Sequence, residues 1–335
     1  MTERQWVLGV DIGGTSVTVG AVSVDGREVL GLRNAPTPVA DGPDAVVEGV
    51  AEMASGAFAE LKASGGDGKR VLGVGIGCPG PLRRDEGVVV TTPNLGWKDF
   101  PIRDRVSDAL GLPAALDNDA NCAVLGEWWQ GAGRGSRILV GLTLGTGIGG
   151  GIVLDGRVFH GASDVAGEAG HMTVNFSGRR CKCGNYGCLE AYASGPNIAS
   201  RAVEGLRSGT ESSLQRFLDD GPERITAEVI AREAVAGDAF ATHIMTETAE
   251  LLGAGVASLV NLLNPDTVVI AGGVARAGPP LFTPLRGEVR RRAFQSGVDA
   301  CSIVPGALPD RAGVVGAAAT FLLDSSGRLP TTDAG

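Results

Sequence analysis

The sequence has no long apolar run and no excess of positive charge. Its nearest approach to a membrane segment, residues 138–154, contains six glycines and two threonines, so we expect no transmembrane helix. The net charge of −9 argues against a general surface for nucleic acid or anionic membrane. The chain runs from Met1-Thr2-Glu3-Arg4 straight into a strand-like segment, without the features of a signal peptide. We therefore expect a cytoplasmic protein.

The common nucleotide-binding motifs are also missing. No G-x-x-x-x-G-K-[ST] string occurs, so the chain is not a P-loop enzyme. Residues 75–80 and 145–150 both fit G-x-G-x-x-G by letter, but the Rossmann motif needs a helix directly afterwards. Pro79 and Pro81 disrupt the first segment, and a strand-like run follows the second. Neither segment predicts a dinucleotide site.

What is present describes a globular chain of more than one domain. Its 335 residues exceed the usual size of a single core, and 43% are hydrophobic while 20% are charged. A strand–turn–strand pattern occurs twice, each copy closed by an Asp-Gly turn and later followed by an apolar strand that ends in glycines. Helical periodicity is found at residues 44–63, 120–129 and 239–263. This alternation predicts an α/β fold of two related domains that face each other across a cleft.

Each copy of the hairpin turns on glycines. The first turn is Gly13-Gly14-Thr15 and the second is Gly145-Thr146-Gly147. Such turns expose consecutive backbone N–H groups that can hold phosphate oxygens, and Asp11 is placed to hold Mg²⁺, directly or through water. A third glycine corner, Gly272-Gly273, would complete a nucleotide site by holding the nucleoside. The alternative is that each turn is an ordinary tight hairpin.

Four metal-type side chains lie within eighteen residues, namely His171, Cys181, Cys183 and Cys188. One imidazole and three thiolates can complete a tetrahedral zinc shell, and a closed shell of this kind is usually structural. The alternative is a disulfide pair with a spare thiol, which an intracellular chain disfavours. Glu168 precedes the cluster and Glu190 follows it, so a zinc ion here would hold two carboxylates in fixed positions.

The segment Asp117-Asn118-Asp119-Ala120-Asn121 precedes the helix expected at 120–129. One interpretation is that it only caps that helix. The functional interpretation is that Asp119 accepts the proton of an attacking hydroxyl, since an alcohol is a poor nucleophile without a base. Both can hold if Asp117 or Asn118 satisfies the helix end. We expect His160 at the surface, with the mouth of the cleft as the alternative.

Four segments resemble the ROK family (repressor, ORF, kinase), and within it the bacterial ATP-dependent glucokinases. They are Asp11-Ile12-Gly13-Gly14-Thr15, Leu144 to Gly151, Gly167-Glu168-Ala169-Gly170-His171, and Cys181 to Glu190. The resemblance runs from about residue 7 to about 321. It implies an actin/hexokinase-type (ribonuclease H-like) duplicated fold, a structural zinc, and transfer of the ATP γ-phosphoryl group to a hexose 6-hydroxyl. We place a small domain at residues 1–122 plus about 315–335, and a large one with the zinc motif at 123–314.

The resemblance also implies a set of sugar contacts and an assembly. The residues that match the family's sugar site are Gly80, Asn94, Asn118, Asp119, Glu168, His171 and Glu190. His171 would serve twice, with one ring nitrogen on zinc and the other on the sugar. Ser16 stands where many family members carry a lysine, which puts in doubt a basic phosphate contact there. A homo-oligomer, a dimer or a tetramer, is expected on resemblance alone.

Three alternatives stay open at this point. The sugar could be mannose, fructose, N-acetylglucosamine or N-acetylmannosamine in place of glucose. The phosphate donor could be polyphosphate, although the acidic composition argues mildly against that polyanion. The chain could instead be a sugar-sensing regulator. A repressor would need an N-terminal helix-turn-helix segment, which we do not expect, because the first strand-like run begins at Trp6.

Overall fold

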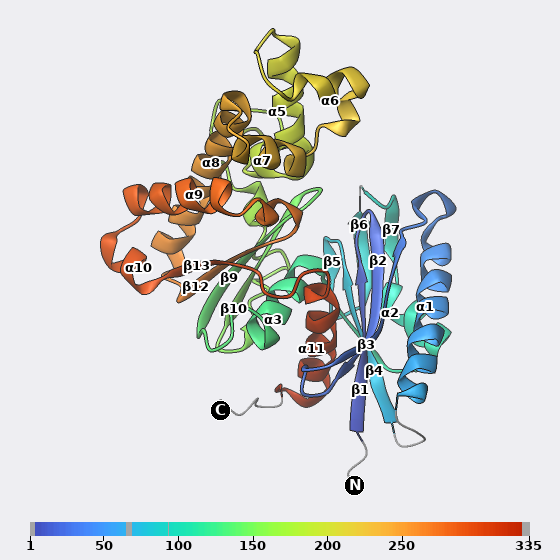
Figure 1. Cartoon of the computed structure of the whole chain (residues 1–335). Coiled ribbons are helices and arrows are strands. Elements are labelled where there is room, and N and C mark those ends of the chain that lie inside the picture. Colours follow the sequence, from blue (N-terminus) through green and yellow to red (C-terminus); the bar gives the residue numbers. More distant parts are fainter. Residues whose placement is uncertain (1–3, 65–68, 93, 330–335) are drawn as a thin grey trace. The chain divides into compact units, whose positions relative to one another are not determined.

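The computed structural model describes residues 4–64, 69–92 and 94–329, which form two compact units (Figure 1). The first unit comprises Met1–Gly135, Gly156–Ala166 and Leu308–Gly335, and the second comprises Ser136–Asp155 and Gly167–Ala307. The domain bounds predicted from the sequence differ: the first segment of the small domain ends at residue 122, and its C-terminal segment begins near residue 315. The predicted α/β class is confirmed in both units.

The first unit is built on a five-stranded sheet of order β3-β2-β1-β4-β8. Its strands are β1 (Arg4–Ile12), β2 (Ser16–Ser23), β3 (Val29–Pro36), β4 (Lys69–Cys78) and β8 (Ala114–Asn118). The three N-terminal strands form an antiparallel meander, and β4 and β8 join β1 in parallel. The hairpin expected around Gly13-Gly14-Thr15 is therefore confirmed.

In the second unit the strand order β10-β9-β12-β13 repeats the order β2-β1-β4-β8 of the first. Its strands are β9 (Ile138–Leu144), β10 (Ile148–Leu154), β12 (Thr267–Ala271) and β13 (Ser302–Pro305). The β9–β10 pair is antiparallel, whereas β12 pairs in parallel with both β9 and β13. The short β11 (Arg157–Val158) follows β10 after the Asp155-Gly156 turn. The repeat seen in the sequence is thus a repeat of topology.

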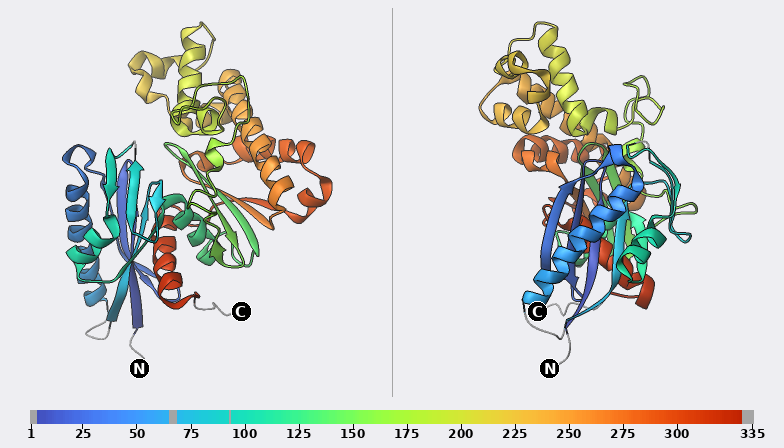
Figure 2. Two further views of the ribbon diagram at one scale, coloured as in Figure 1. Left: turned by 180° about the vertical axis from the view of Figure 1, so that it is seen from behind. Right: turned by 90° about the vertical axis from the view of Figure 1, so that its right-hand side faces the viewer.

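Helices cover both faces of the first sheet (Figures 1 and 2). The helices α1 (Pro43–Ala63) and α2 (Ile102–Leu110) pack on one face, and α3 (Asp119–Gln130) and α11 (Ala312–Ser326) pack on the other. Glycines allow α11 to approach closely, because a Cβ on Gly75 would lie 1.6 Å from the Ala317 carbonyl oxygen. A small antiparallel sheet of β5 (Leu82–Arg83), β6 (Val88–Thr92) and β7 (Trp97–Phe100) completes this unit.

The second unit is richer in helices. Its longest are α5 (Gly195–Arg207), α8 (Ala239–Leu263) and α9 (Pro279–Arg292), and the shorter ones are α4 (Glu190–Ala193), α6 (Gln215–Asp220), α7 (Ala227–Val235) and α10 (Gln295–Ala300). The 3₁₀ turns are η2 (Ala169–His171), η3 (Pro222–Arg224) and η4 (Gly273–Ala277), with η1 (Val39–Asp41) in the first unit. One hydrophobic cluster joins buried residues of β9, such as Leu142, to Leu252 and Val256 of α8.

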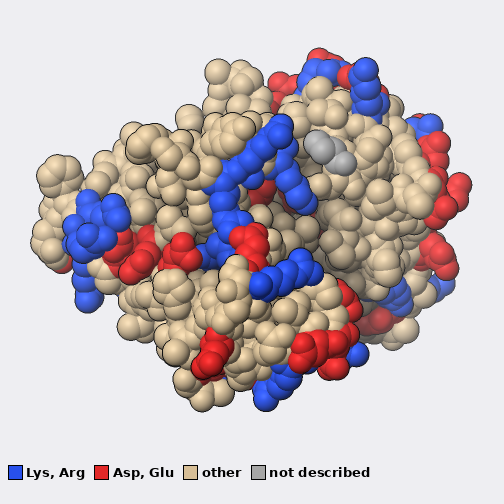
Figure 3. Space-filling model, turned by 90° about the horizontal axis from the view of Figure 1, so that it is seen from above, with Lys and Arg blue, Asp and Glu red and all other residues tan. Residues whose placement is uncertain are grey.

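Among the described residues, none of the helices combines the length and apolar composition needed to cross a bilayer. Figure 3 shows one face of the molecule, on which Lys and Arg side chains lie among Asp and Glu instead of forming a continuous field of one sign.

Candidate functional site

The carboxyl ends of β1, β4 and β8 carry the polar residues of the first unit. Asp11 is in register with Gly77, and Gly77 is in register with Asp117, so the two acids occupy equivalent rows of the sheet. The start of α3 lies close against Gly77, since a Cβ there would lie 3.2 Å from the Cys122 sulfur and 3.4 Å from the Asp119 Cα. Parallel strands thus bring Asp11, Asp117 and the first residue of α3 to one edge of the sheet.

The first turn of α3 shows how residues 117–121 satisfy the helix end. Asn118 is the N-cap, and its side-chain oxygen accepts hydrogen bonds from the backbone N–H groups of Ala120 (2.9 Å) and Asn121 (3.2 Å). Asp119 is the first residue of the helix, and its Oδ1 accepts from the Ala120 N–H at 2.9 Å. The expectation that a neighbour would satisfy the helix end is confirmed, with Asn118 in that place.

Asp11 lies at the end of β1 against the first turn of α11. A Cβ on Gly313 would lie 2.1 Å from Asp11 Oδ2, so only glycine at 313 accommodates this carboxylate. Burial, and to a smaller extent the negative charge of Asp119, raise the pKa of Asp11 to about 7. Two acids close together repel each other when both are ionised, and a divalent cation held by oxygen ligands would relieve that repulsion.

The first glycine turn lies directly after Asp11. The Gly13 N–H donates to the Ser16 carbonyl at 2.8 Å, and the Thr37 hydroxyl donates to the Gly13 carbonyl at 2.7 Å. Gly14 and Thr15 at the tip are exposed, as a phosphate-binding turn requires. A Cβ on Gly14 would lie 3.4 Å from the Asn94 Cβ, which places the predicted sugar contact Asn94 beside the turn.

The other predicted contact of the first unit, Gly80, lies beside the helix cap. A Cβ on Gly80 would lie 3.6 Å from the Asn118 side-chain nitrogen. The first unit therefore brings together Asn118 and Gly80 at one point, and Asn94 and Gly14 at another, while Asp11 and Asp119 interact electrostatically.

The second glycine turn joins β9 to β10 and is held by a predicted sugar contact, Glu190. The Gly145 N–H donates to the Gly147 carbonyl at 2.9 Å, and Gly145 and Thr146 are exposed. Glu190 Oε2 accepts from the Ile148 N–H at 2.9 Å, and a Cβ on Gly147 would lie 2.6 Å from this oxygen. The turn and the glutamate are thus packed against each other.

The third glycine segment adjoins the second one. Gly272, directly after β12, has a φ of +89°, and a Cβ there would lie 2.5 Å from the Leu144 carbonyl oxygen at the end of β9. Only glycine fits this position without a shift of the neighbouring strand. Gly273 begins η4. The structure therefore places all predicted nucleotide residues of the second unit at the carboxyl ends of adjacent strands.

His171, Cys181, Cys183 and Cys188 converge as expected. Their ligand atoms all lie within 4.8 Å of one another. The Cys183 and Cys188 sulfurs are 3.7 Å apart, and the Cys181 sulfur is 3.8 Å from His171 Nδ1. The two glycines inside the loop have positive φ angles, 96° at Gly184 and 71° at Gly187. Their left-handed backbone lets the chain turn twice in a short distance.

The spacing of these atoms fits zinc. Sulfurs that lie about 2.3 Å from a zinc ion in tetrahedral geometry are about 3.7 Å apart, which matches the Cys183–Cys188 separation. Burial is the largest cause that raises the pKa of the Cys188 thiol to about 12, whereas metal ligands bind as thiolates. A cation would therefore be needed to hold this cysteine in its ionised form.

Zinc ligation through Nδ1 would leave the second nitrogen of His171 on the opposite side of the ring. Nδ1 is the nitrogen near Cys181, while Nε2 lies 4.0 Å from Glu168 Oε2. Burial, and secondarily the charge of Glu190, raise the pKa of Glu168, and the nearby His171 opposes this shift. Glu168, His171 and Glu190 thus form one polar group beside the cysteines.

The sequence does not predict the contact between His160 and Asp117, since His160 is expected at the surface. Its side chain is 21% exposed, and Nε2 lies 2.8 Å from Oδ2 of Asp117, whose residue is 3% exposed. The expectation is wrong because burial of Asp117 requires a donor, which comes from a segment 43 residues further along the chain. Local sequence gives no signal of that pairing.

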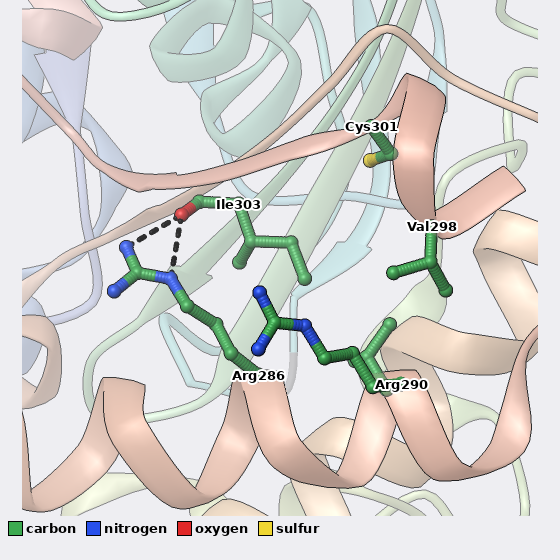
Figure 4. Close-up of a pocket in the computed structure, with 6 residues that line it drawn as sticks. Arg286, Arg290, Val298, Cys301 and Ile303 are labelled. Carbon is green, nitrogen blue, oxygen red and sulfur yellow. Dashed lines mark hydrogen bonds between the residues drawn. The ribbon is translucent and has the colours of Figure 1, made fainter. Parts of the chain in front are cut away.

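A surface pocket of the second unit lies apart from these residues. It is lined by Val289, Val298, Ile303, Arg286, Arg290 and Cys301, from α9, α10 and the β13 region (Figure 4). The Arg286 guanidinium donates two hydrogen bonds to the Ile303 carbonyl, at 3.1 and 2.7 Å. None of the site residues predicted from the sequence is in this lining.

Comparisons with protein families, with single sequences and with solved structures identify relatives of this chain. Residues 7–323 match the sequence profile of the ROK family. The glucokinase of Halalkalibacterium halodurans is 38% identical to this chain over 94% of each sequence. The putative xylose repressor of a Caldicellulosiruptor species is 34% identical over 95% of this chain and 78% of its own length. The crystal structure of a ROK family glucokinase from Streptomyces griseus, in complex with glucose and AMPPNP, superposes with a TM-score of 0.80 at 34% identity, covering 94% of this chain and 98% of that one.

Proposed function

Because the chain belongs to the ROK family, we propose that it is an ATP-dependent hexose kinase whose substrate is glucose. The product is glucose 6-phosphate, formed by transfer of the ATP γ-phosphoryl group to the 6-hydroxyl. The observation that carries the proposal is the placement of Asp119 at the capped start of α3, within electrostatic reach of Asp11. A hydroxyl-activating carboxylate beside a cation-binding one is what phosphoryl transfer to an alcohol requires.

We assign the role of general base to Asp119. A carboxylate within hydrogen-bond reach of the 6-hydroxyl orients its oxygen and takes its proton as the oxygen attacks phosphorus. The Asn118 cap fixes the helix turn that carries this carboxylate. Because the base is on a helix start and not on a free loop, its position is set before the sugar binds.

We assign ATP to the three glycine segments. The turns Gly13-Gly14-Thr15 and Gly145-Thr146-Gly147, exposed at Gly14-Thr15 and at Gly145-Thr146, are suited to phosphate oxygens, and Gly272-Gly273 is suited to the nucleoside. Asp11 would hold Mg²⁺, which supplies neutralisation of the negative charge on the phosphate oxygens. Ser16 offers no positive charge at the end of the first turn, so backbone N–H groups and Asp11 carry more of the binding.

We assign the sugar hydroxyls to Gly80, Asn94 and Asn118 of the first unit and to Glu168, His171 and Glu190 of the second. Carboxylates and amides in fixed places distinguish a hexose from its epimers, since an unmatched buried polar group is costly. A structural zinc bound by His171 and the three cysteines would fix the positions of Glu168, His171 and Glu190. This assignment is supported by the placement of His171 Nδ1 toward Cys181 and of Nε2 toward Glu168.

A sugar-sensing regulator is the second candidate, and the likeness to a putative xylose repressor is the observation that favours it. A sensor would bind the sugar without turning over ATP. Another hexose or polyphosphate as the donor would keep the same base and the same glycine turns. We also propose a cytoplasmic location and a homo-oligomer, dimer or tetramer, for which sedimentation velocity is the direct measurement.

The test is a panel of purified-protein assays. Glucose, mannose, fructose, N-acetylglucosamine and N-acetylmannosamine are each offered with Mg-ATP and, separately, with polyphosphate. The proposal expects the highest kcat/KM for glucose with ATP. A higher value for another sugar or donor would correct the substrate, and sugar binding without any transfer would identify the sensor.

A further inference from the structure

The segment of residues 159–166 follows β11 and contains none of the residues assigned a role above. Two side chains anchor it to the rest of the first unit. His160 Nε2 lies 2.8 Å from Asp117 Oδ2, and Asp164 Oδ2 accepts from the Arg84 backbone N–H at 3.3 Å. The segment closes on itself through a hydrogen bond from the Ala166 N–H to the His160 carbonyl, at 3.1 Å. His160 is therefore anchored both through its side chain and through its backbone carbonyl.

Asp117 shares its carboxylate between His160 and the start of α3. While Oδ2 faces His160, Oδ1 accepts from the Asn118 N–H at 2.7 Å and from the Asn121 side-chain amide at 3.1 Å. Because a carboxylate only accepts, the facing His160 nitrogen carries the hydrogen. The orientation of this buried carboxylate is thus set from both sides.

We propose that His160 is a positioning residue for phosphoryl transfer, acting through Asp117 on the first turn of α3. Asp117 is hydrogen-bonded to residues on both sides of Asp119, namely Asn118 and Asn121. If His160 is lost, Oδ2 of Asp117 loses its donor at a site that is nearly closed to water, and the carboxylate must reorient. The turn that carries Asp119 then shifts with it.

The expected effect is on kcat more than on KM. A displacement of about 1 Å at a reacting group costs on the order of 10²-fold in rate. Other residues also contribute to the sugar and nucleotide sites assigned above, so the affinity of the protein for glucose and for ATP changes little. The inference rests on the proposed kinase function for this kinetic readout alone.

The experiment compares three variants with the wild-type chain. His160→Phe keeps a planar ring without a donor, and His160→Gln keeps an amide donor. Asp164→Gly removes the segment's other anchor at a position whose φ of 59° glycine accepts, without touching Asp117. The measurements are kcat, KM for glucose, thermal midpoint, and amide hydrogen exchange at residues 119–122.

We expect His160→Phe to lower kcat by about 10- to 100-fold with KM within about threefold, and His160→Gln to restore kcat to within about fivefold of wild type. Exchange at residues 119–122 rises in His160→Phe but not in Asp164→Gly, even if both lose similar thermal stability. An unchanged kcat in His160→Phe, or an equal loss of kcat in Asp164→Gly, overturns the inference. If the wild-type chain transfers no phosphate, the proposed function fails, and the exchange data alone decide the role of His160.

Discussion

Asp11 is an acid that the fold keeps partly protonated near neutral pH. Its pKa is raised to about 7, mainly by burial, from an ordinary value of 3.8. A carboxyl group whose folded pKa is raised binds protons more tightly in the folded state, so stability falls as pH rises from about 4 to about 7. The loss of stability is absent at a pH below the pKa of Asp11 in the unfolded state and complete at a pH above its pKa in the folded state.

We therefore expect Asp11→Asn to stabilise the metal-free protein only at higher pH. The gain is about 2 kcal/mol above pH 7, less than the full shift would give, because the Asp11 side chain is only partly buried and solvent screens part of the effect. At pH 4 the variant and the wild type should unfold alike. Thermal midpoints measured in EDTA across pH 4–8 check this, and a constant difference at every pH contradicts it.

Single residues also show how far the sequence alone could lead. The zinc-type cluster and the Asn118 cap follow from local spacing, because their partners lie within eighteen residues of one another. The His160–Asp117 contact joins residues 43 positions apart, and no periodicity or motif encodes it. The roles of the predicted sugar and nucleotide residues stay predictions that only binding and kinetic measurements can test.

At the scale of elements, the loop of residues 171–188 carries the four candidate zinc ligands. Its apolar packing comes from Met172 and Val174 near its start and from the buried Cys181 and Cys188, while Cys183 is exposed. We expect Cys183→Ser to lower zinc content and to lower the thermal midpoint by about 5–10 °C, since structural zinc binding is coupled to folding.

The matched control for that prediction is Cys301→Ser, outside the cluster. It should leave the zinc content unchanged. Metal analysis together with differential scanning calorimetry gives both quantities. Full stability and wild-type glucose affinity in a zinc-free Cys183→Ser protein would show that the metal stabilises neither the fold nor the sugar site.

The packing of α11 on the first sheet gives a second element-scale prediction. Gly75→Ala would place a methyl group 1.6 Å from the Ala317 carbonyl oxygen, so the helix must move away from β4. We expect a loss of about 4 kcal/mol or more. Gly49→Ala in α1 is the control, because no atom lies within 4 Å of the added Cβ and helix propensity favours alanine by about 1 kcal/mol. Urea unfolding of both variants tests the contrast.

Elements were the level at which sequence patterns were most informative. The helix predicted at 239–263 coincides with α8, and the two predicted strand–turn–strand patterns correspond to β1–β2 and β9–β10. The region 205–224 gave no clear pattern, and the structure resolves it into the end of α5, the short α6 and η3. Short helices of this kind depend on tertiary contacts, such as the Arg216–Glu233 ion pair, instead of on their own periodicity.

At the scale of the whole molecule, the duplication explains why the candidate residues fall into two sets. Each unit repeats a hairpin followed by parallel strands, and in each the glycine turn lies at the same edge as the ends of those strands. The sequence revealed this repeat through its two Asp-Gly turns. It did not reveal where the chain crosses from one unit to the other, because that depends on long-range packing.

The central claim is that Asp119 activates the 6-hydroxyl of glucose for transfer from ATP. The most direct measurement is the rate of glucose 6-phosphate formation with saturating Mg-ATP and glucose, in wild type and Asp119→Asn, with the product identified by ³¹P NMR. The account predicts turnover in the wild type and a loss of at least about 10²-fold in kcat in the variant, with glucose still bound. Wild-type turnover that survives in Asp119→Asn would contradict it.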